Sequence, residues 1–517
     1  MKKIFFSGVL LALALTSCSD YLDVNENQNN RPNFESLSPK QMLAGVINNY
    51  TTYQDVTLAT YGNRLAYAWG LNSGFTSTDA AYTHRYDSNS YSNIFESNYL
   101  FADNCQDILD KKTAYPEYSY HFGIAKVFKV MFMDYATAMY GDVPYSEAFN
   151  SKIATPKYDD DKKIIPALFS ELDEARAYLA VSGAKALGNE DIVFKGNLTL
   201  WNQFINTVEL KLLLRLSKTT DATLVALRTA RFAKLQTQTF INQDVTVDPG
   251  YYLGSLPSRN PIFRSFGRNE GLNDWLSANR ANAAGDFIAQ ILNGSLNNSD
   301  INSTGVVDPR RARMFTLVGG KVVGNTQGVF PLTAISRFST FYFGRTTADT
   351  QGDTNAAARN AFLMLNAESK FLQAEAIQRG YLPGNAQQVF NDGITASFNF
   401  YSTGFGTVVL TPLDAAAYIA ATDSKNGLGW TGSTDKVNAI ITQKYLALAQ
   451  WHGIELYIDH LRTGFPKLPL PVGVNNTTRP NRLIYPSSEY STNSSNVPNI
   501  TNDELFTVNA KTPYYLQ

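Results

Sequence analysis

Aromatic side chains set in polar loops are the residues of this 517-residue chain best suited to chemistry. Aromatic faces stack on sugar rings or hold apolar peptide side chains, while Asn, Asp and Arg form directed hydrogen bonds. Our candidate ligand-binding residues are Trp69, Asn72, Phe75, Asp79, Tyr82, Arg85, Tyr86, Trp275, Phe341, Tyr342 and Trp430. Packing of a loop onto a scaffold is the commoner role for any one aromatic residue, so we expect only some of them, at least two, to line a site. Such a surface suits a neutral polar ligand better than a highly charged one.

No pattern in the chain indicates catalysis. H-E-x-x-H, C-x-x-C, G-x-S-x-G and Walker motifs are absent, and the four histidines are scattered, at positions 84, 121, 452 and 460. Asp23-x-Asn25-x-Asn27 begins like a calcium loop but lacks the glycine and glutamate that such a loop needs at its sixth and twelfth positions. We therefore expect no catalytic residue, no metal site and no cofactor.

Composition and charge narrow the class of protein. Hydrophobic residues make up 44% of the chain, which is typical of a globular protein. The 44 basic and 45 acidic residues leave a net charge of −1, which argues against nucleic acid as a partner, because binding it requires clustered Lys and Arg. Two cysteines provide no disulfide framework, and we expect Cys105 to be a buried thiol.

The N-terminus has the layout of a secretory signal peptide. Lys2 and Lys3 precede an apolar run over residues 4–15, which is shorter than the roughly 20 residues of a membrane span. The sequence LTSC at residues 15–18 resembles a bacterial lipobox. We expect residues 1–17 to be removed, Cys18 to be acylated, and a polar tether over residues 18–37 to join this membrane anchor to the rest of the protein.

The rest of the chain shows the 3.6-residue periodicity of amphipathic helices. Ser38 followed by Pro39 marks the start of the first one. Further helices are predicted at about 115–140, 162–181, 198–218, 221–235, 272–293, 359–379, 385–402 and 435–463. Several form helix–turn–helix pairs like those of tetratricopeptide repeats, although a conventional helical bundle fits the pattern too. The long intervening segments are rich in Gly, Asn, Ser, Thr and aromatics, so we expect a mostly α fold decorated by loops with a few short strands.

Six motifs in a fixed order indicate a family. They are YLDVNEN at 21–27, YGDVPY at 140–145, FSELDEA at 169–175, ESKFLQAEA at 368–376, IITQKYLAL at 440–448 and GIELYIDHLRTG at 453–464. With these motifs the chain resembles the SusD/RagB family of outer-membrane nutrient-binding lipoproteins of Bacteroidota. The resemblance runs from the lipobox nearly to the C-terminus.

The resemblance implies a single SusD-like domain over residues 38–517, with about four tetratricopeptide-like helix pairs packed against a loop-rich half. It also implies a lipid-anchored protein on the outer membrane, facing the extracellular side. The implied partner is a TonB-dependent SusC-like transporter, on which the protein acts as a lid that passes ligand on without altering it. We treat Glu368, Lys444 and Arg462 as fold markers that pair or cap helices, because the family's ligand contacts lie in variable loops.

Four functions remain open at this stage. Capture of an oligosaccharide comes first, and capture of an oligopeptide by the same architecture comes second. A surface adaptor without a small ligand and a surface glycosidase are further alternatives.

Overall fold

The computed structural model describes residues 36–343, 350–404 and 409–517. The expected signal peptide at 1–17, the expected lipid attachment at Cys18 and the Asp23 turn lie outside the described residues, as does nearly all of the expected tether.

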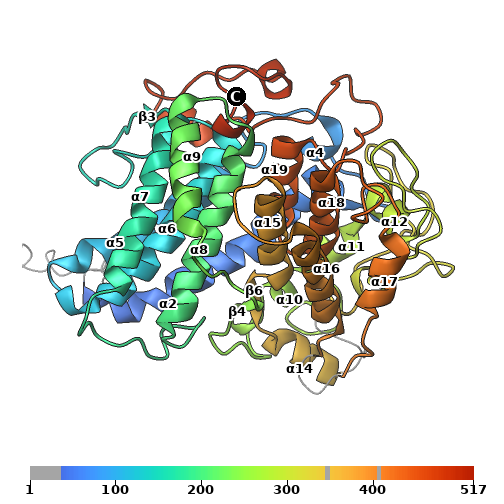
Figure 1. Cartoon of the computed structure of the whole chain (residues 1–517), viewed down its shortest axis with the longest axis horizontal. Coiled ribbons are helices and arrows are strands. Elements are labelled where there is room, and N and C mark those ends of the chain that lie inside the picture. The colour runs from blue at the N-terminus through green and yellow to red at the C-terminus, as the bar shows by residue number, and fades with distance from the viewer. Residues whose placement is uncertain (1–35, 344–349, 405–408) are drawn as a thin grey trace, which may run out of the picture.

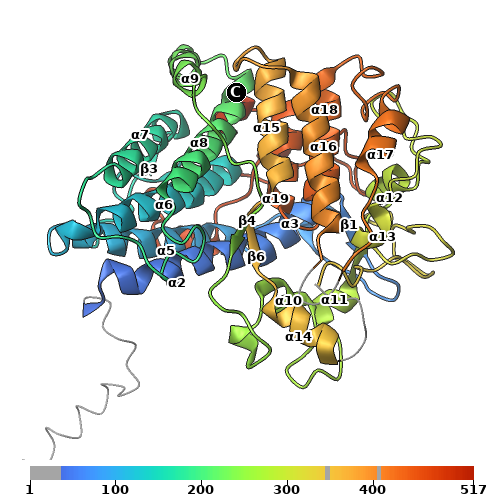
Figure 2. The same ribbon diagram turned by 60° about the horizontal axis from the view of Figure 1, so that its bottom comes forward.

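Helices form two groups that lie side by side (Figures 1 and 2). The first group comprises α5 (Ser92–Leu109), α6 (Ser119–Tyr140), α7 (Asp161–Leu179), α8 (Leu198–Arg215) and α9 (Ala222–Leu235), and it is preceded in the chain by α2 (Pro39–Thr52) and α3 (Ala59–Leu65). The second comprises α15 (Asn366–Gln378), α16 (Ala386–Ser402), α18 (Lys436–Leu448) and α19 (Gly453–Thr463). Neighbouring helices such as α5 and α6, α6 and α7, and α15 and α16 pack against each other, which confirms the mostly α fold.

Shorter helices are set among the long loops and chain ends. They are α4 (Ala80–Thr83), α10 (Pro261–Phe266), α11 (Ser277–Ala281), α12 (Asp286–Leu292), α13 (Arg311–Met314), α14 (Thr350–Ala358), α17 (Ala415–Thr422) and α20 (Ser487–Thr492). The loops around α10 to α13 gather at one end of the molecule, beside α16 to α18 (Figure 2).

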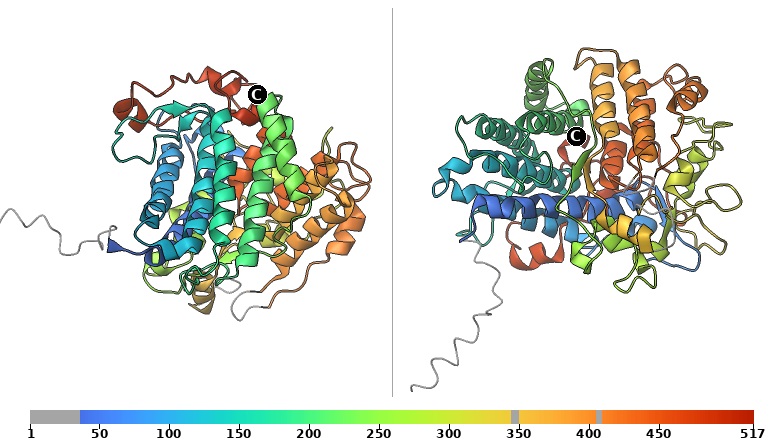
Figure 3. Two further views of the ribbon diagram at one scale, coloured as in Figure 1. Left: turned by 60° about the vertical axis from the view of Figure 1, so that its left-hand side comes forward. Right: turned by 90° about the horizontal axis from the view of Figure 1, so that it is seen from below.

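One long helical segment runs beneath both helix groups (Figure 3, right). It consists of α2, a π-helix (Tyr53–Leu58) and α3, with right-handed helical backbone at both junctions. A capping box starts it: the backbone N–H of Ser38 donates to Gln41 Oε1 at 2.9 Å. It ends where Tyr67 takes a left-handed φ of 55° and turns the chain into the first strand.

Other helix ends follow capping rules that the sequence displays. Asp221 accepts the backbone N–H of Leu224 at 3.0 Å at the start of α9. α6 ends at Gly141, whose φ of +75° favours glycine. The same glycine belongs to the YGDVPY motif, so that motif marks a helix end.

Three two-stranded antiparallel pairs tie distant segments together. β1 (Trp69–Leu71) pairs with β5 (Asn282–Ala284), and Trp69 lies opposite Ala284. β2 (Val143–Pro144) pairs with β3 (Tyr158–Asp159), and β4 (Val245–Val247) pairs with β6 (Ala361–Met364). The β1–β5 pair positions the functional site, because it joins the loop after α3 to the loop-rich region.

Three predicted helices are wrong in part. Residues 272–293 form α11, β5 and α12 in place of one helix, because pairing with β1 draws residues 282–284 into a strand. Residues 361–364 form β6, and all four are buried, so their apolar run carries no period that could separate strand from helix. The predicted helix at 435–463 is two helices, α18 and α19, with a break between them.

Buried ion pairs lock the helices together. Arg215 on α8 donates to Asp134 on α6 at 2.7 Å and to Glu455 on α19 at 3.1 Å. The predicted fold markers take part: Glu368 accepts from Lys211 at 2.8 Å, Lys444 lies 2.9 Å from Asp459, and Arg462 lies 2.5 Å from Glu375. The expected structural role of Glu368, Lys444 and Arg462 is therefore confirmed.

Apolar side chains form one large buried cluster extending from Met42 to Tyr515 and a smaller one around α15, α16 and α18. Cys105 is buried in the large cluster, as predicted, and burial raises the pKa of its thiol well above the ordinary value. Among the described residues, the helices are all too short or too polar to cross a membrane.

Candidate ligand-binding site

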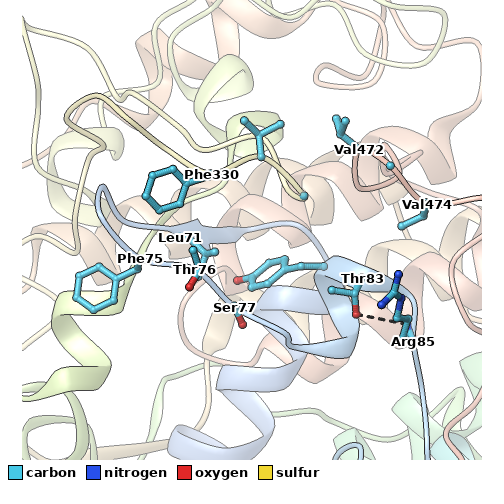
Figure 4. A pocket seen from close by; sticks show the side chains of 13 residues that line it. Leu71, Phe75, Thr76, Ser77, Thr83, Arg85, Phe330, Val472 and Val474 are labelled. Atoms are coloured by element: carbon cyan, nitrogen blue, oxygen red, sulfur yellow. Dashed lines mark hydrogen bonds between the residues drawn. The ribbon is translucent and has the colours of Figure 1, made fainter.

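A pocket of about 340 Å³ opens where three loops of the loop-rich region meet (Figure 4). Its first wall is the chain after β1, its second the turn around Gly328 to Phe330, and its third the turn around Val472 to Val474. Three predicted ligand-binding residues, Phe75, Tyr82 and Arg85, line it. A volume of this size is typical of small-molecule sites.

The first wall is held by residues that the sequence also singled out. Asn72 donates its side-chain N–H to the carbonyl of Arg280 at 2.8 Å, and its backbone N–H to that of Ala281 at 2.9 Å. Asp79 caps α4 by accepting the N–H of Ala81 at 2.9 Å, and it accepts from Arg64 at 2.7 Å. Asn72 and Asp79 therefore shape the wall, and neither lines the pocket.

A buried hydrogen-bonding hub joins the three walls. Gln327, just before Gly328, donates its amide to the carbonyls of Arg64 at 2.8 Å and Trp69 at 3.1 Å. The carbonyl of Gln327 accepts the N–H of Val472 at 2.8 Å, and its side-chain oxygen accepts from Arg479 at 3.0 Å. Since these groups are buried, the hub fixes the relative position of the walls.

Close approach of the second and third walls depends on a glycine. A Cβ at Gly328 would lie 2.3 Å from the carbonyl oxygen of Val472. Gly473, which also lines the pocket, has the same φ of +84°, yet a Cβ there would meet nothing within 4 Å. Gly328 is thus required for contact between the walls, whereas Gly473 is required only by its backbone conformation.

The pocket surface combines aromatic, aliphatic and polar groups. Phe330 and Val472 are 46% and 56% exposed. Figure 4 shows Phe75 and Phe330 toward one end and Arg85 toward the other. The polar lining includes the hydroxyls of Thr76, Ser77 and Thr83.

Tyr82 gives the pocket a buried hydroxyl. Its oxygen has no hydrogen-bond partner within the described ranges. Burial raises the pKa of this phenol well above the ordinary value, so the group stays protonated and can donate. The oxygen is itself shielded from solvent, so Tyr82 lines the pocket without presenting its hydroxyl to a ligand in this conformation.

Four predicted ligand contacts are core residues, and the prediction is wrong for them. Trp69 is fully buried against Phe266 and Phe338, and Tyr342 donates its hydroxyl to the carbonyl of Gln450 at 3.3 Å. Phe341 packs on Phe400 and Tyr401. Tyr86 is buried against Tyr91 and Phe506. Each ring packs a loop onto the scaffold and offers no free face.

Trp275 and Trp430 are half-buried and lie outside the lining of this pocket. Trp275 contacts the ring of Phe343 with centroids 5.3 Å apart, and Trp430 contacts Phe390 at 5.5 Å. A role in ligand binding stays a prediction for both.

Sequence reasoning missed the second and third walls. Gly328, Val329, Phe330, Val472, Gly473 and Val474 lie far from the first wall in sequence. The one available signal was a pair of apolar residues, Val329 and Phe330, directly before Pro331 in a polar segment.

One group of carboxylates could be taken for a metal site. Oxygens of Asp142, Asp160 and Asp161 lie within 4.8 Å of one another. Each already accepts a backbone N–H: Asp142 that of Asp161 at 2.9 Å, Asp160 that of Lys162 at 2.9 Å, and Asp161 that of Tyr514 at 2.6 Å. The cluster therefore starts α7 and anchors the C-terminal segment.

Comparison with known proteins places this architecture in one family. The family described as starch-binding and associating with the outer membrane matches residues 31–486. A SusD homologue from Bacteroides fragilis has 22% identity and a TM-score of 0.68, covering 93% of this chain and 100% of its own. A chitin-binding SusD homologue from Flavobacterium johnsoniae has 22% identity and a TM-score of 0.68, covering 92% of this chain and 98% of its own.

A Bacteroides vulgatus outer-membrane protein whose description names nutrient binding has 19% identity and a TM-score of 0.69, covering 93% of this chain and 100% of its own. No curated protein matches the chain. The family match extends over most of the sequence and agrees with the solved structures in fold. The chain therefore belongs to the SusD-like family of non-catalytic, nutrient-binding proteins associated with the outer membrane.

Proposed function

We propose that the protein captures an oligosaccharide in the pocket between its three loops and delivers it to a TonB-dependent SusC-like transporter, on which it acts as a lid. The observation that supports this is the pairing of Phe75 and Phe330 with hydroxyl groups and one guanidinium in a single pocket. Aromatic faces suit the apolar faces of sugar rings, and the polar groups suit their hydroxyls. The chitin-binding homologue and the family's starch-binding description point the same way.

Oligopeptide capture is the second candidate. Val329, Phe330 and Val472 are 42%, 46% and 56% exposed at the pocket, and such aliphatic groups would also hold apolar peptide side chains. Calorimetry with a panel of oligosaccharides and peptides separates the two candidates. Saturable heat from peptides alone would reject the oligosaccharide.

The pocket itself is tested by replacing Phe75 and Phe330 with alanine. Both side chains are partly exposed, so the variants should fold and lose affinity. Unchanged affinity in both would move the site elsewhere, with Trp275 and Trp430 as the next positions to test.

The anchor and the partner complete the proposal. Acylation of Cys18 would hold the domain at 38–517 on the extracellular side of the outer membrane through the tether at 18–37. Metabolic labelling with palmitate should mark the wild-type protein and not Cys18→Ser. Purification from outer membranes in mild detergent should bring a TonB-dependent transporter with the protein.

A further inference from the structure

Arg85 is the one charged side chain among the residues that line the pocket. It is exposed at the mouth, and within the described part of the chain its guanidinium makes no hydrogen bond or ion pair. Its backbone N–H donates to the hydroxyl of Thr83 at 3.4 Å, which fixes the main chain and leaves the side chain available (Figure 4).

A second cation lies directly behind the wall. Arg479 is 3% exposed and donates to the carbonyl of Leu65 at 2.9 Å, the side-chain oxygen of Gln327 at 3.0 Å and the carbonyl of Pro469 at 2.5 Å. These acceptors are all neutral, and no carboxylate of the described residues lies within ion-pair distance. Its Nε has no partner there either. A buried charge without a counter-charge is costly, so this one raises the positive potential of the pocket.

The charge of Arg479 acts on a neighbouring titratable group. Burial, followed by the charge of Arg479, lowers the pKa of His84 to about 4, so this histidine is neutral at pH 7. Asp79 of the first wall is paired with Arg64 and also accepts from the hydroxyl of Tyr91. Asp87, two residues after Arg85, accepts from the backbone N–H of Asn89 at 2.9 Å and the hydroxyl of Ser90 at 2.9 Å. Residues 259–343, which include the second wall, hold nine basic and five acidic residues, a net charge of +4.

We propose that the ligand is an acidic oligosaccharide and that Arg85 binds one of its carboxylates at the pocket mouth while Phe75 and Phe330 contact sugar rings. The inference rests on the proposed function and departs from the neutral ligand expected from sequence. A planar guanidinium matches a carboxylate with two parallel hydrogen bonds, which makes Arg85 a specificity-determining residue.

The test uses pairs of oligosaccharides that differ only in charge. Uronic acid oligomers and the methyl esters of the same oligomers are titrated into the protein by calorimetry, together with neutral starch and chitin oligosaccharides. We expect an acidic oligomer to bind about tenfold or more tightly than its ester, with an affinity that falls as salt rises.

Variants assign that preference to one side chain. Arg85→Gln should remove most of the difference between acid and ester, and Arg85→Lys should keep part of it because the charge remains. Arg313→Gln is the matched control, because Arg313 belongs to the positive segment 259–343 and does not line the pocket.

Each outcome decides the proposal. Acid preference that Arg85→Gln abolishes and Arg313→Gln retains supports it. Binding of a neutral oligosaccharide without acid preference, or acid preference unchanged in Arg85→Gln, overturns the inference and leaves the proposed function standing. Failure of every oligosaccharide to bind overturns both.

Discussion

Buried cations have different partners in the helical scaffold and beneath the pocket. Arg215, Lys211 and Arg462 of the scaffold all face carboxylates within 2.5–3.3 Å. Arg479 under the pocket donates to carbonyl and amide oxygens and lies over the ring of Tyr67, and among the described residues it has no carboxylate within ion-pair distance. Net charge differs too: residues 86–190 of the helical part hold 10 basic and 16 acidic residues, a net charge of −6, against +4 for residues 259–343.

The contrast distinguishes cations that stabilise the fold by pairing with carboxylates from a cation whose charge can act on a ligand. A carboxylate beside each of these three scaffold cations offsets the cost of its burial, so these pairs keep helices in register. The loops around the pocket hold a cation in place with neutral acceptors, which leaves its field free to act on whatever enters the site.

The largest expected effect is on the scaffold. Arg215→Met should lower the free energy of unfolding by about 3–5 kcal/mol, because Asp134 and Glu455 lose their buried partner. Arg85→Met, in the exposed pocket mouth, should change it by about 0.5 kcal/mol or less. Urea unfolding of both variants measures the difference. Equal losses would mean that the two arginines do not differ in structural role.

Substitution of Trp69 should affect the free energy of unfolding, whereas substitution of Phe330 should affect ligand binding. Trp69→Ala should cost about 3–5 kcal/mol of unfolding free energy, because its fully buried ring fills the core beside Phe266 and Phe338. Phe330→Ala should leave stability nearly unchanged and weaken ligand binding by about 1–3 kcal/mol if its ring stacks on a sugar, by analogy with base stacking. Thermal unfolding and calorimetry on both variants test this; a stable Trp69→Ala protein with weakened binding would restore Trp69 to the site.

The two glycines of the pocket walls provide a matched pair. Gly328→Ala and Gly473→Ala should each cost about 1–2 kcal/mol for placing a side chain at the same φ of +84°. Only Gly328→Ala should also weaken binding, because its Cβ would push the third wall away at Val472. If Gly473→Ala weakens binding as much, loop conformation and not wall contact controls the pocket.

The smallest effect concerns pH and the acidic helical part. Burial, followed by the charge of Asp142, raises the pKa of Asp161 to about 7, so the folded state holds this proton more tightly than the unfolded state. Its contribution to stability is then fully present below about pH 4 and is lost as pH rises toward 7. Asp161→Asn should flatten the fall in melting temperature between pH 5 and 7, with Asp173→Asn as an exposed control. Parallel pH profiles for wild type and Asp161→Asn would contradict this.

Sequence predicted the scaffold better than the site, for a physical reason. Helices such as α8 and α9 can be predicted from their own residues, because an apolar stripe and a capping residue such as Asp221 lie within or beside the helix. The prediction missed strand β6 because all of its residues are buried and show no alternation. It missed strand β5 because the partner strand β1 lies more than 200 residues away in the sequence.

The candidate site mixed two kinds of aromatic residue that look alike in sequence. Trp69 and Phe75 both stand in polar loops, yet Trp69 faces the core while Phe75 lines the pocket. Whether an aromatic residue packs in the core or lines a pocket depends on the segment that lies against it. For Phe75 that segment is the turn around Phe330. A single sequence does not reveal such a pairing.

The uninterrupted run from α2 through α3 has a mechanical consequence. Residues 39–65 form a helical rod of roughly 40 Å, and the chain passes from its far end into β1 and the first wall within a few residues. The N-terminal end of this rod is where a membrane tether would pull. Because α2 packs against α5 and α6, and α3 packs against α19, a pull at Pro39 would be borne by the whole packed scaffold and would reach the first wall only through it.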